Sequence, residues 1–226
     1  MPIRQDRPIA DFSPELKSAL NRTVSIPRWK TYQTATGFRD DVAHSLYLWN
    51  AAVGQSFHFP LQAAEVALRN VVNQALCQVA GDNWWSDRAG RQIVGADRCE
   101  DIDKAATRLR RKYGGSPDTG QIVASLMLGF WAAMLKREYN RPIWDSQSAT
   151  AFPHLGPSES IRDVSSLANA TQDLRNRIFH HEPLISRSLS DDYGNILRLL
   201  GWICPITKEW VRHHASVPTV IRQKPR

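Results

Sequence analysis

The sequence is poor in cysteine and lacks any long apolar run. Its 226 residues include three cysteines, Cys77, Cys99 and Cys204, an odd number without the spacing of a disulfide framework or a zinc site. No stretch approaches the roughly 20 apolar residues that cross a bilayer, and the N-terminus lacks the apolar centre of a signal peptide. We therefore expect a cytoplasmic protein that does not contact a membrane.

The motifs of several common enzyme classes are also absent. The chain has no GxxxxGK[ST] phosphate loop, no GxGxxG turn after a strand, no GxSxG elbow and no HExxH helix. These absences argue against P-loop nucleotide hydrolases, Rossmann enzymes, α/β hydrolases and zincins. The adjacent histidines His180–His181 and His213–His214 point about 100° apart on a helix, so neither pair can chelate one ion. We expect no metal and no cofactor.

Helical spacing dominates the chain, and no segment alternates apolar and polar residues as a strand would. Apolar residues recur three and four positions apart over about residues 40–56, and Pro60 opens a second apolar stripe that Gly81 ends. Residues 96–115 are acidic at the start and basic at the end, which complements a helix dipole. Residues 120–135 are apolar nearly all the way round and predict the central buried helix.

Proline positions divide the rest of the chain. Ser13 and Pro14 predict a short capped helix in the N-terminal segment. A proline-rich loop at about 142–157 precedes a long helix at about 158–181, and Pro205 should kink the helix that follows. The sequence thus predicts an all-α bundle of about six to eight helices. The expected divisions are an N-terminal arm with one short helix (1–30), a helical domain (31–213) and a frayed basic tail (214–226).

The composition favours a packed body with an anionic partner. Hydrophobic residues make up 42% of the chain, and its eight tryptophans argue against a disordered protein. Twenty-nine lysines and arginines against 22 aspartates and glutamates give a formal net charge of +7. Because such a chain attracts polyanions, nucleic acid or an acidic protein is the first partner to consider.

The ten residues LRNRIFHHEP, 174–183, place a charge where a helix should be apolar. Arg175 falls inside the predicted buried stripe of the last long helix before Pro183. A guanidinium in that position needs a carboxylate, a bound phosphate or a partner subunit. The predicted stripe consists of Val164, Leu167, Ala168, Thr171, Leu174, Ile178 and Phe179.

The end of the same helix carries further polar residues. Pro183 should end the helix one or two residues earlier, which puts His180 in the last turn, four residues after Asn176. Basic residues are common in last turns, so for Arg177 and His181 taken alone a solvated helix end is the preferred explanation. That explanation does not cover Arg175, because its place in the stripe is what needs a reason.

The segment LRNRIFHHEP resembles the R-x4-H motif of the HEPN superfamily, in the form found in bacterial Abi-like (abortive infection) proteins. Two further stretches are similar to the same group and occur in the same order: LQAAEVALRNVVNQAL, residues 61–76, and GQIVASLMLGFWAAML, residues 120–135. The resemblance covers the chain from about residue 30 to about residue 210. It implies an all-α, HEPN-like helical bundle.

The resemblance also implies a function and a set of catalytic residues. Members of this group act as metal-independent endoribonucleases, usually as homodimers, and serve as toxins in phage defence or growth arrest. Arg175, Asn176 and His180 occupy the catalytic positions. His180 would move a proton during attack of a ribose 2′-OH on the adjacent phosphate, Arg175 would stabilise the developing charge, and Asn176 would orient one of these groups or the phosphate. RNA is the implied substrate.

The resemblance departs from one regulated branch of the superfamily. HEPN proteins that pair with a nucleotidyltransferase antitoxin often have a tyrosine two residues after the motif histidine, and Glu182 stands there in this chain. An antitoxin protein is therefore a candidate partner only if it acts by another route than modification of that tyrosine.

Several alternatives stay open at this point. Glu65 and Arg69 are either an ordinary intrahelical ion pair or support for the site, with Glu65 as the carboxylate that fixes Arg175. Arg177 and His181 are candidate supporting residues in the second case. The whole chain is a ribonuclease, a catalytically inactive RNA- or protein-binding module of the same fold, or a structural helical dimer in which Arg175 makes an interfacial ion pair. A basic run is read as the ordinary end of a helix: Arg108, Arg110, Arg111 and Lys112.

Overall fold

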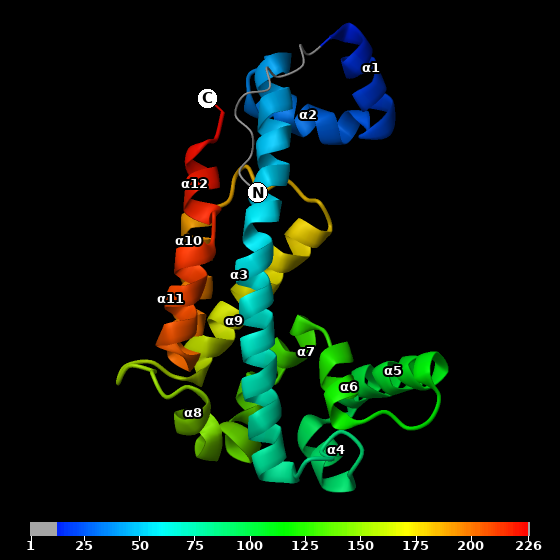
Figure 1. Ribbon diagram of the computed structural model, residues 1–226, viewed down its shortest axis with the longest axis vertical. Coiled ribbons are helices and arrows are strands. Elements are labelled where there is room, and N and C mark those ends of the chain that lie inside the picture. The colour runs from blue at the N-terminus through cyan, green and yellow to red at the C-terminus, as the bar shows by residue number, and fades with distance from the viewer. Residues whose placement is uncertain (1–12, 226) are drawn as a thin grey trace. The chain divides into compact units, whose positions relative to one another are not determined.

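The computed structural model describes residues 13–225, and that range is helical with no strand (Figure 1). The first helices are α1 (Pro14–Thr23), α2 (Ile26–Ala35), α3 (Asp40–Ala80), α4 (Arg88–Val94), α5 (Ala96–Tyr113) and α6 (Thr119–Ser125). The others are α7 (Leu128–Ala133), α8 (Asp145–Ala151), α9 (Ile161–Phe179), α10 (Leu189–Ile203), α11 (Pro205–His214) and α12 (Val217–Arg222). A 3-10 turn, η1 (Arg137–Tyr139), and a π-turn, η2 (Asn140–Trp144), precede α8.

The all-α expectation is confirmed, and the expected count of six to eight helices is wrong, because the described residues form twelve α-helices. One reason is a break in the segment predicted as the central helix. Leu126 and Met127 both have extended backbone angles, with ψ of 137° and 161°, and they separate α6 from α7. A capping box formed by Asp118 and Gln121 fixes the start of α6.

Prolines also act differently from the expectation. Pro60 does not open a helix, because α3 runs through it from Asp40 to Ala80. Burial of the flanking Phe57 and Leu61 offsets the lost backbone hydrogen bond. Pro205 does not kink a continuous helix: Cys204 is extended, and Pro205 is the first residue of α11. The loop expected at 142–157 contains η2 and α8.

The described residues belong to two compact units that cut across the linear division expected from the sequence. The first unit comprises the residues up to His58, Arg177–Ser190 and the residues from Ser216 onward; the second comprises Phe59–Asn176 and Asp191–Ala215. Both α3 and α9 contribute residues to both units. Residues 1–12 of the expected N-terminal arm lie outside the described range.

The first unit includes buried aromatic residues of α2 and α3: Trp29, Tyr32 and Trp49. As predicted, Ser13 caps α1, its hydroxyl accepting from the Leu16 backbone N–H at 3.2 Å.

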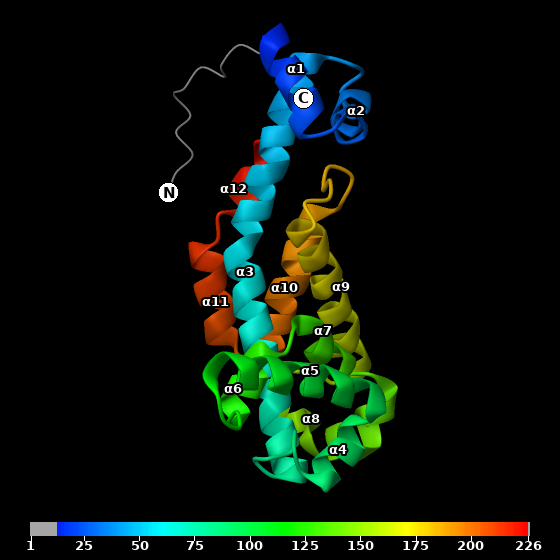
Figure 2. The same ribbon diagram turned by 90° about the vertical axis from the view of Figure 1, so that its right-hand side faces the viewer.

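The expected fraying of the C-terminal tail is wrong, because α12 packs beside the first part of α3 (Figure 2). There the indole N–H of the buried Trp49 donates to the Val220 carbonyl at 2.8 Å. This hydrogen bond holds the C-terminal helix against α3, whereas helix propensity alone would leave a terminal segment poorly ordered.

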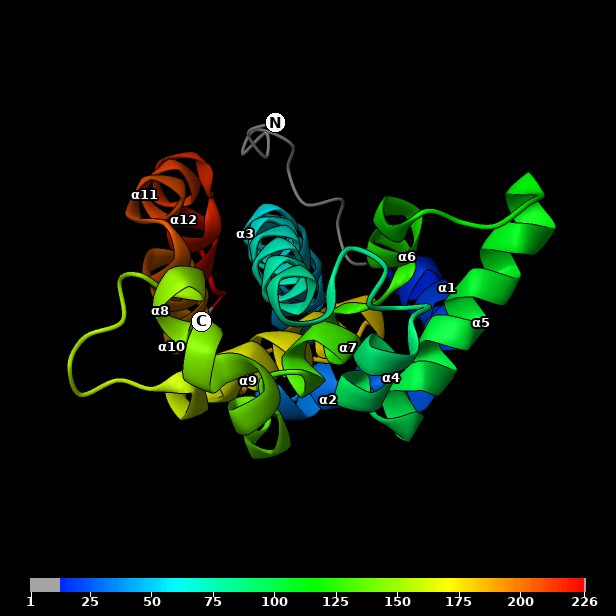
Figure 3. The ribbon, with the colours of Figure 1, turned by 90° about the horizontal axis from the view of Figure 1, so that it is seen from below.

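The second unit surrounds the later part of α3, with α10 and α11 on one side and α4 and α5 on the other (Figure 3). Its core includes three fully buried tryptophans, Trp84, Trp131 and Trp144. A bidentate ion pair joins α4 to α5, with Arg91 nitrogens 3.0 and 2.8 Å from the Asp103 carboxylate oxygens. This fork geometry fixes the position of α5 in the second unit.

Candidate functional site

The boundary between the two units falls inside the 174–183 segment. Arg175 and Asn176 belong to the second unit, whereas Arg177, His180 and His181 belong to the first. The structure therefore assigns the first two residues of the sequence motif and its histidine to different compact bodies.

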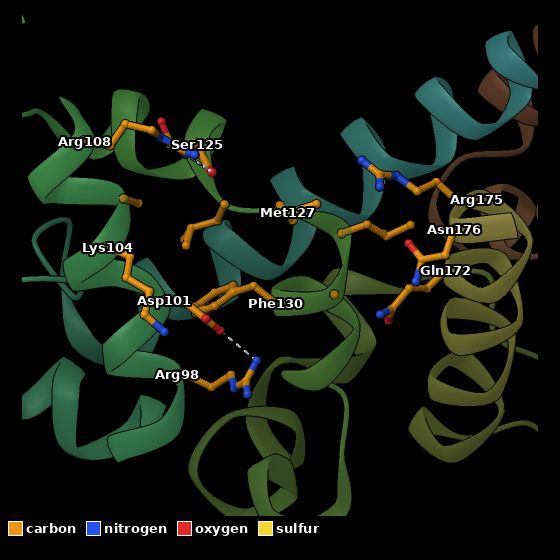
Figure 4. Close-up of a pocket in the computed structure, with 14 residues that line it drawn as sticks. Arg98, Asp101, Lys104, Arg108, Ser125, Met127, Phe130, Gln172, Arg175 and Asn176 are labelled. Atoms are coloured by element: carbon orange, nitrogen blue, oxygen red, sulfur yellow. Dashed lines mark hydrogen bonds and ion pairs between the residues drawn. The ribbon is translucent and has the colours of Figure 1, made fainter. Parts of the chain in front are cut away.

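Arg175 and Asn176 line a groove of about 390 Å³ on the second unit, here named the basic groove (Figure 4). Helix α5 forms one bank, α9 forms the other, and the turn between α6 and α7 lies between them. The groove is lined by Arg98, Asp101, Lys104, Ala105, Arg108, residues 125–130, Gln172, Arg175 and Asn176.

Four cationic side chains and one carboxylate line the basic groove. Arg98 is paired with that carboxylate, its Nη1 lying 2.8 Å from Oδ2 of Asp101. Arg108 donates to the Ser125 backbone carbonyl at 3.0 Å, which ties α5 to the end of α6. Lys104 makes only a long, exposed contact of 3.4 Å with Glu100. The groove thus keeps a positive excess that suits a phosphate-bearing ligand.

Arg175 faces a carboxylate, one of the partners that its place in the stripe requires. Its Nε lies 3.9 Å from Oε2 of Glu65 on α3, and the two side chains are only 19% and 26% exposed. Within residues 13–225 the ion pair of Glu65 is with Arg175 and not with Arg69. The structure therefore favours Glu65 as a support for Arg175 over the intrahelical pair.

Asn176 stands beside Gln172 on the α9 bank (Figure 4). A Cβ atom placed on Gly129 of α7 would lie 2.9 Å from the Gln172 amide nitrogen. Helix α7 therefore contacts the polar face of α9 at this point. As a result, two side-chain amides and one guanidinium project from α9 on the same wall of the groove.

The last turn of α9 ends in a Schellman motif in the first unit. The His181 N–H donates to the Ile178 carbonyl at 3.0 Å, and the Glu182 N–H donates to the Arg177 carbonyl at 2.8 Å. His181 takes the left-handed position with φ of +56°, where glycine is usual. His180 is the C-cap residue and is exposed. The helix ends at Phe179, slightly before the expected residues.

Two other predicted residues take definite places at this helix end. Arg177 lies 3.4 Å from the Glu182 carboxylate, a half-exposed pair that fixes the turn after the helix. Phe179 was expected to be buried, but its side chain is 49% exposed. That expectation is wrong because Phe179 is the final helical residue, and helical periodicity does not predict what packs beyond a helix end.

The basic groove contains residues that sequence reasoning did not select. Arg98, Lys104 and Gln172 were not candidates, and Arg108 was assigned to an ordinary basic helix end. For the α5 residues, the signal that predicts a shared face is their spacing, because Arg98, Asp101, Lys104 and Arg108 recur three or four positions apart. That spacing places them along one side of α5.

The described residues contain neither a cluster of metal ligands nor a helix that could cross a membrane. No group of three or more histidine, cysteine, aspartate or glutamate side chains in residues 13–225 has the geometry to hold a metal ion. None of the helices in that range is both long enough and apolar enough to cross a bilayer.

Comparison of the chain with models of known protein families, with curated proteins and with solved structures found no match.

Proposed function

We propose that the chain is a metal-independent endoribonuclease of the HEPN type, a toxin that cleaves RNA in phage defence or growth arrest. The observation that carries this proposal is the basic groove, because Arg175 and Asn176 of the 174–183 segment line it together with Arg98, Lys104 and Arg108. An RNA backbone carries one charge per phosphate, and lysine and arginine side chains are its usual ligands.

Arg175 would bind the phosphate that reacts. Its guanidinium can donate two parallel hydrogen bonds to phosphate oxygens, and Glu65 at 3.9 Å from its Nε restrains the side chain. As the 2′-oxygen bonds to phosphorus, negative charge grows on the phosphoryl oxygens. A guanidinium already in place stabilises that charge at little cost in reorganisation. The Asn176 amide, on the same groove wall, would orient a phosphate oxygen.

His180 would carry the proton. In the proposed reaction the O2′–P bond forms, the P–O5′ bond breaks, the 2′-OH loses a proton and the leaving 5′-oxygen gains one. The products are a 2′,3′-cyclic phosphate and a free 5′-OH. The imidazole of His180 is exposed and can reach solvent or substrate. We propose a homodimer as the active form, in which motifs from two chains share one cleft.

The first experiment incubates purified protein with total RNA in EDTA and maps the ends of the fragments. We expect 2′,3′-cyclic phosphate ends from the wild type and none from His180→Ala. His213→Ala is the matched control, because His213 is also exposed and lies outside the segment. Cleavage by His180→Ala at the wild-type rate would remove His180 from the mechanism, and dependence on added metal would contradict the proposed chemistry.

A second candidate function is RNA binding without cleavage, which the basic groove supports by itself. Four cations along one groove would hold a backbone whether or not a proton is transferred. This candidate predicts retention of RNA that weakens steeply with salt and leaves all fragments uncut. The same incubation, read together with a binding measurement, separates the two functions.

A further inference from the structure

The first unit contains a pocket of about 460 Å³ that the proposed chemistry does not use. Three segments form it: α2, one face of α3 and the turn that follows α9. Its volume falls in the range of roughly 300–1,000 Å³ that small-molecule sites occupy. We call it the aromatic pocket, after the tyrosine and phenylalanine rings in its wall: Tyr32, Tyr47 and Phe179.

The rings are held in different ways. Tyr47 packs against Trp29 and Tyr32, with ring centroids 6.2 and 5.1 Å apart, so its ring is fixed in the wall. Burial of Tyr32, with Tyr47 beside it, raises the pKa of Tyr32 to about 12, so its hydroxyl stays neutral. Phe179 is 49% exposed at the rim. A planar apolar ligand could therefore contact Tyr47 and Phe179.

Most polar groups of the pocket can donate hydrogen bonds, and Glu182 adds one carboxylate, which lies 3.4 Å from Arg177. Asn50 uses its Oδ1 to accept from the Leu184 N–H at 2.7 Å, which leaves its amide N–H groups for a ligand. Gln55 and His58 are exposed on the same face of α3, and Arg28 adds a cation from α2. A ligand with an aromatic ring, acceptor atoms and an anionic group fits this set.

Two further features connect the pocket to the 174–183 segment. His181 lines the pocket from the left-handed C′ position of the Schellman motif, with φ of +56°. His181 also directly follows His180 in the sequence, so a ligand in the pocket would contact the residue next to the proposed proton carrier.

We propose that the aromatic pocket binds one unstacked nucleobase of single-stranded RNA, with Arg28 contacting the adjoining phosphate. This inference rests on the proposed function, and it adds base selection to it. Bases splayed out of a single strand are commonly stacked on aromatic side chains and read by neighbouring amides. A base held beside His181 would determine which phosphate reaches His180, and hence where the strand is cut.

The test measures binding of single-stranded oligonucleotides of about ten nucleotides with 2′-fluoro sugars. These have no 2′-OH nucleophile, so binding is read without cleavage. Four homopolymers are compared with an abasic strand of equal charge. We expect the best base to bind at least about fivefold more tightly than the abasic strand, as loss of one stacked base typically costs. Equal binding of all five strands would overturn the proposal.

Blocking the pocket should remove that preference. Ala51 is a small, exposed residue of the wall, so Ala51→Trp would fill the space and bring the best homopolymer to the abasic level. The control is Ala35→Trp, an exposed alanine outside the pocket, which should keep the preference. A second pair, Phe179→Leu against Phe38→Leu, tests the rim ring without adding bulk. Retained preference in both Ala51→Trp and Phe179→Leu would place base recognition elsewhere.

Failure of the pocket and failure of the ribonuclease are distinguishable. Absence of a base preference in the wild type, together with cleavage of total RNA, contradicts the pocket alone. A base preference in a protein that never cleaves RNA supports the pocket and contradicts the ribonuclease.

Discussion

The basic groove of the second unit and the aromatic pocket of the first unit are both lined by residues of the 174–183 segment, yet the two sites differ in chemistry. The groove has four cations, three of them on α5, and suits repeating phosphates of any sequence. The pocket has rings, hydrogen-bond donors, one cation, Arg28, and one carboxylate, Glu182, and in the proposed role it takes a single base. In the proposed function the two compact units therefore divide one segment into a part for affinity and a part for selection.

The largest expected effect tests the groove side. Arg175→Ala should lower RNA cleavage by about 10²–10³-fold, because one preorganised donor to the developing charge is lost. Base preference in 2′-fluoro strands should persist, since Arg175 does not line the aromatic pocket. Single-turnover cleavage rates give the first quantity and titrations the second. Arg162→Ala is the control, an exposed arginine of α9 outside the groove, and an equal loss of rate in that variant would contradict a special role for Arg175.

The next effect concerns the α5 bank. Lys104→Gln and Arg108→Gln should each weaken RNA binding uniformly across sequences. Each should also make the slope of log affinity against log salt less steep by about 0.7, because one phosphate contact is lost. The control is Arg222→Gln, an exposed arginine of α12 outside the groove. Unchanged slopes in both groove variants would remove α5 from the RNA path.

Local signals explain which parts of the fold the sequence predicted. The start of α1 follows from Ser13 and Pro14, and the end of α5 follows from Gly114, whose φ of +72° suits glycine. The break at Leu126 and Met127 was missed, because both residues are apolar like the helices on either side, although Met127 is 62% exposed. Tertiary burial also carries α3 through Pro60, which sequence rules treat as a helix start.

The candidate site was predicted in part for the same reason. A helical wheel shows that Arg175 needs a partner, and it also shows that Glu65 and Arg69 share a helix. Whether Glu65 pairs with Arg69 or with Arg175 depends on how α3 packs against α9, and sequence periodicity does not contain that information. The pairing of α5 with α9 across the basic groove is tertiary as well, so Arg98 and Gln172 were missed.

A smaller effect sharpens the assignment of Glu65. Glu65→Gln and Arg175→Gln, alone and together, form a double-mutant cycle on the free energy of unfolding. We expect a coupling of about 0.5–1 kcal/mol, because the pair is largely buried but long, at 3.9 Å. Urea unfolding of the four proteins gives the value. The cycle of Arg69→Gln with Arg175→Gln should show no coupling, and equal values in both cycles would mean that Glu65 has no specific role.

The smallest expected effect compares the two units through one carboxylate in each. In the second unit, Arg198, the Gly156 N–H and the Trp202 indole lower the pKa of Glu159 from its ordinary 4.5; in the first unit, Lys17 and Gln33 lower the pKa of Asp40 from 3.8. A lowered folded-state pKa stabilises the protein above the unfolded-state value, and this contribution is lost as the pH falls through the folded-state value.

Unfolding midpoints in urea, measured from about pH 6 downward, should therefore begin to fall near the ordinary carboxyl values. Glu159→Gln and Asp40→Asn should each flatten part of that decline, because neither amide titrates in this range. Glu138→Gln, which removes an exposed carboxylate, is the control and should leave the profile close to that of the wild type. If both variants instead reproduce the wild-type profile, other carboxylates account for the acid sensitivity. If only one flattens it, acid acts first on the unit that contains that carboxylate.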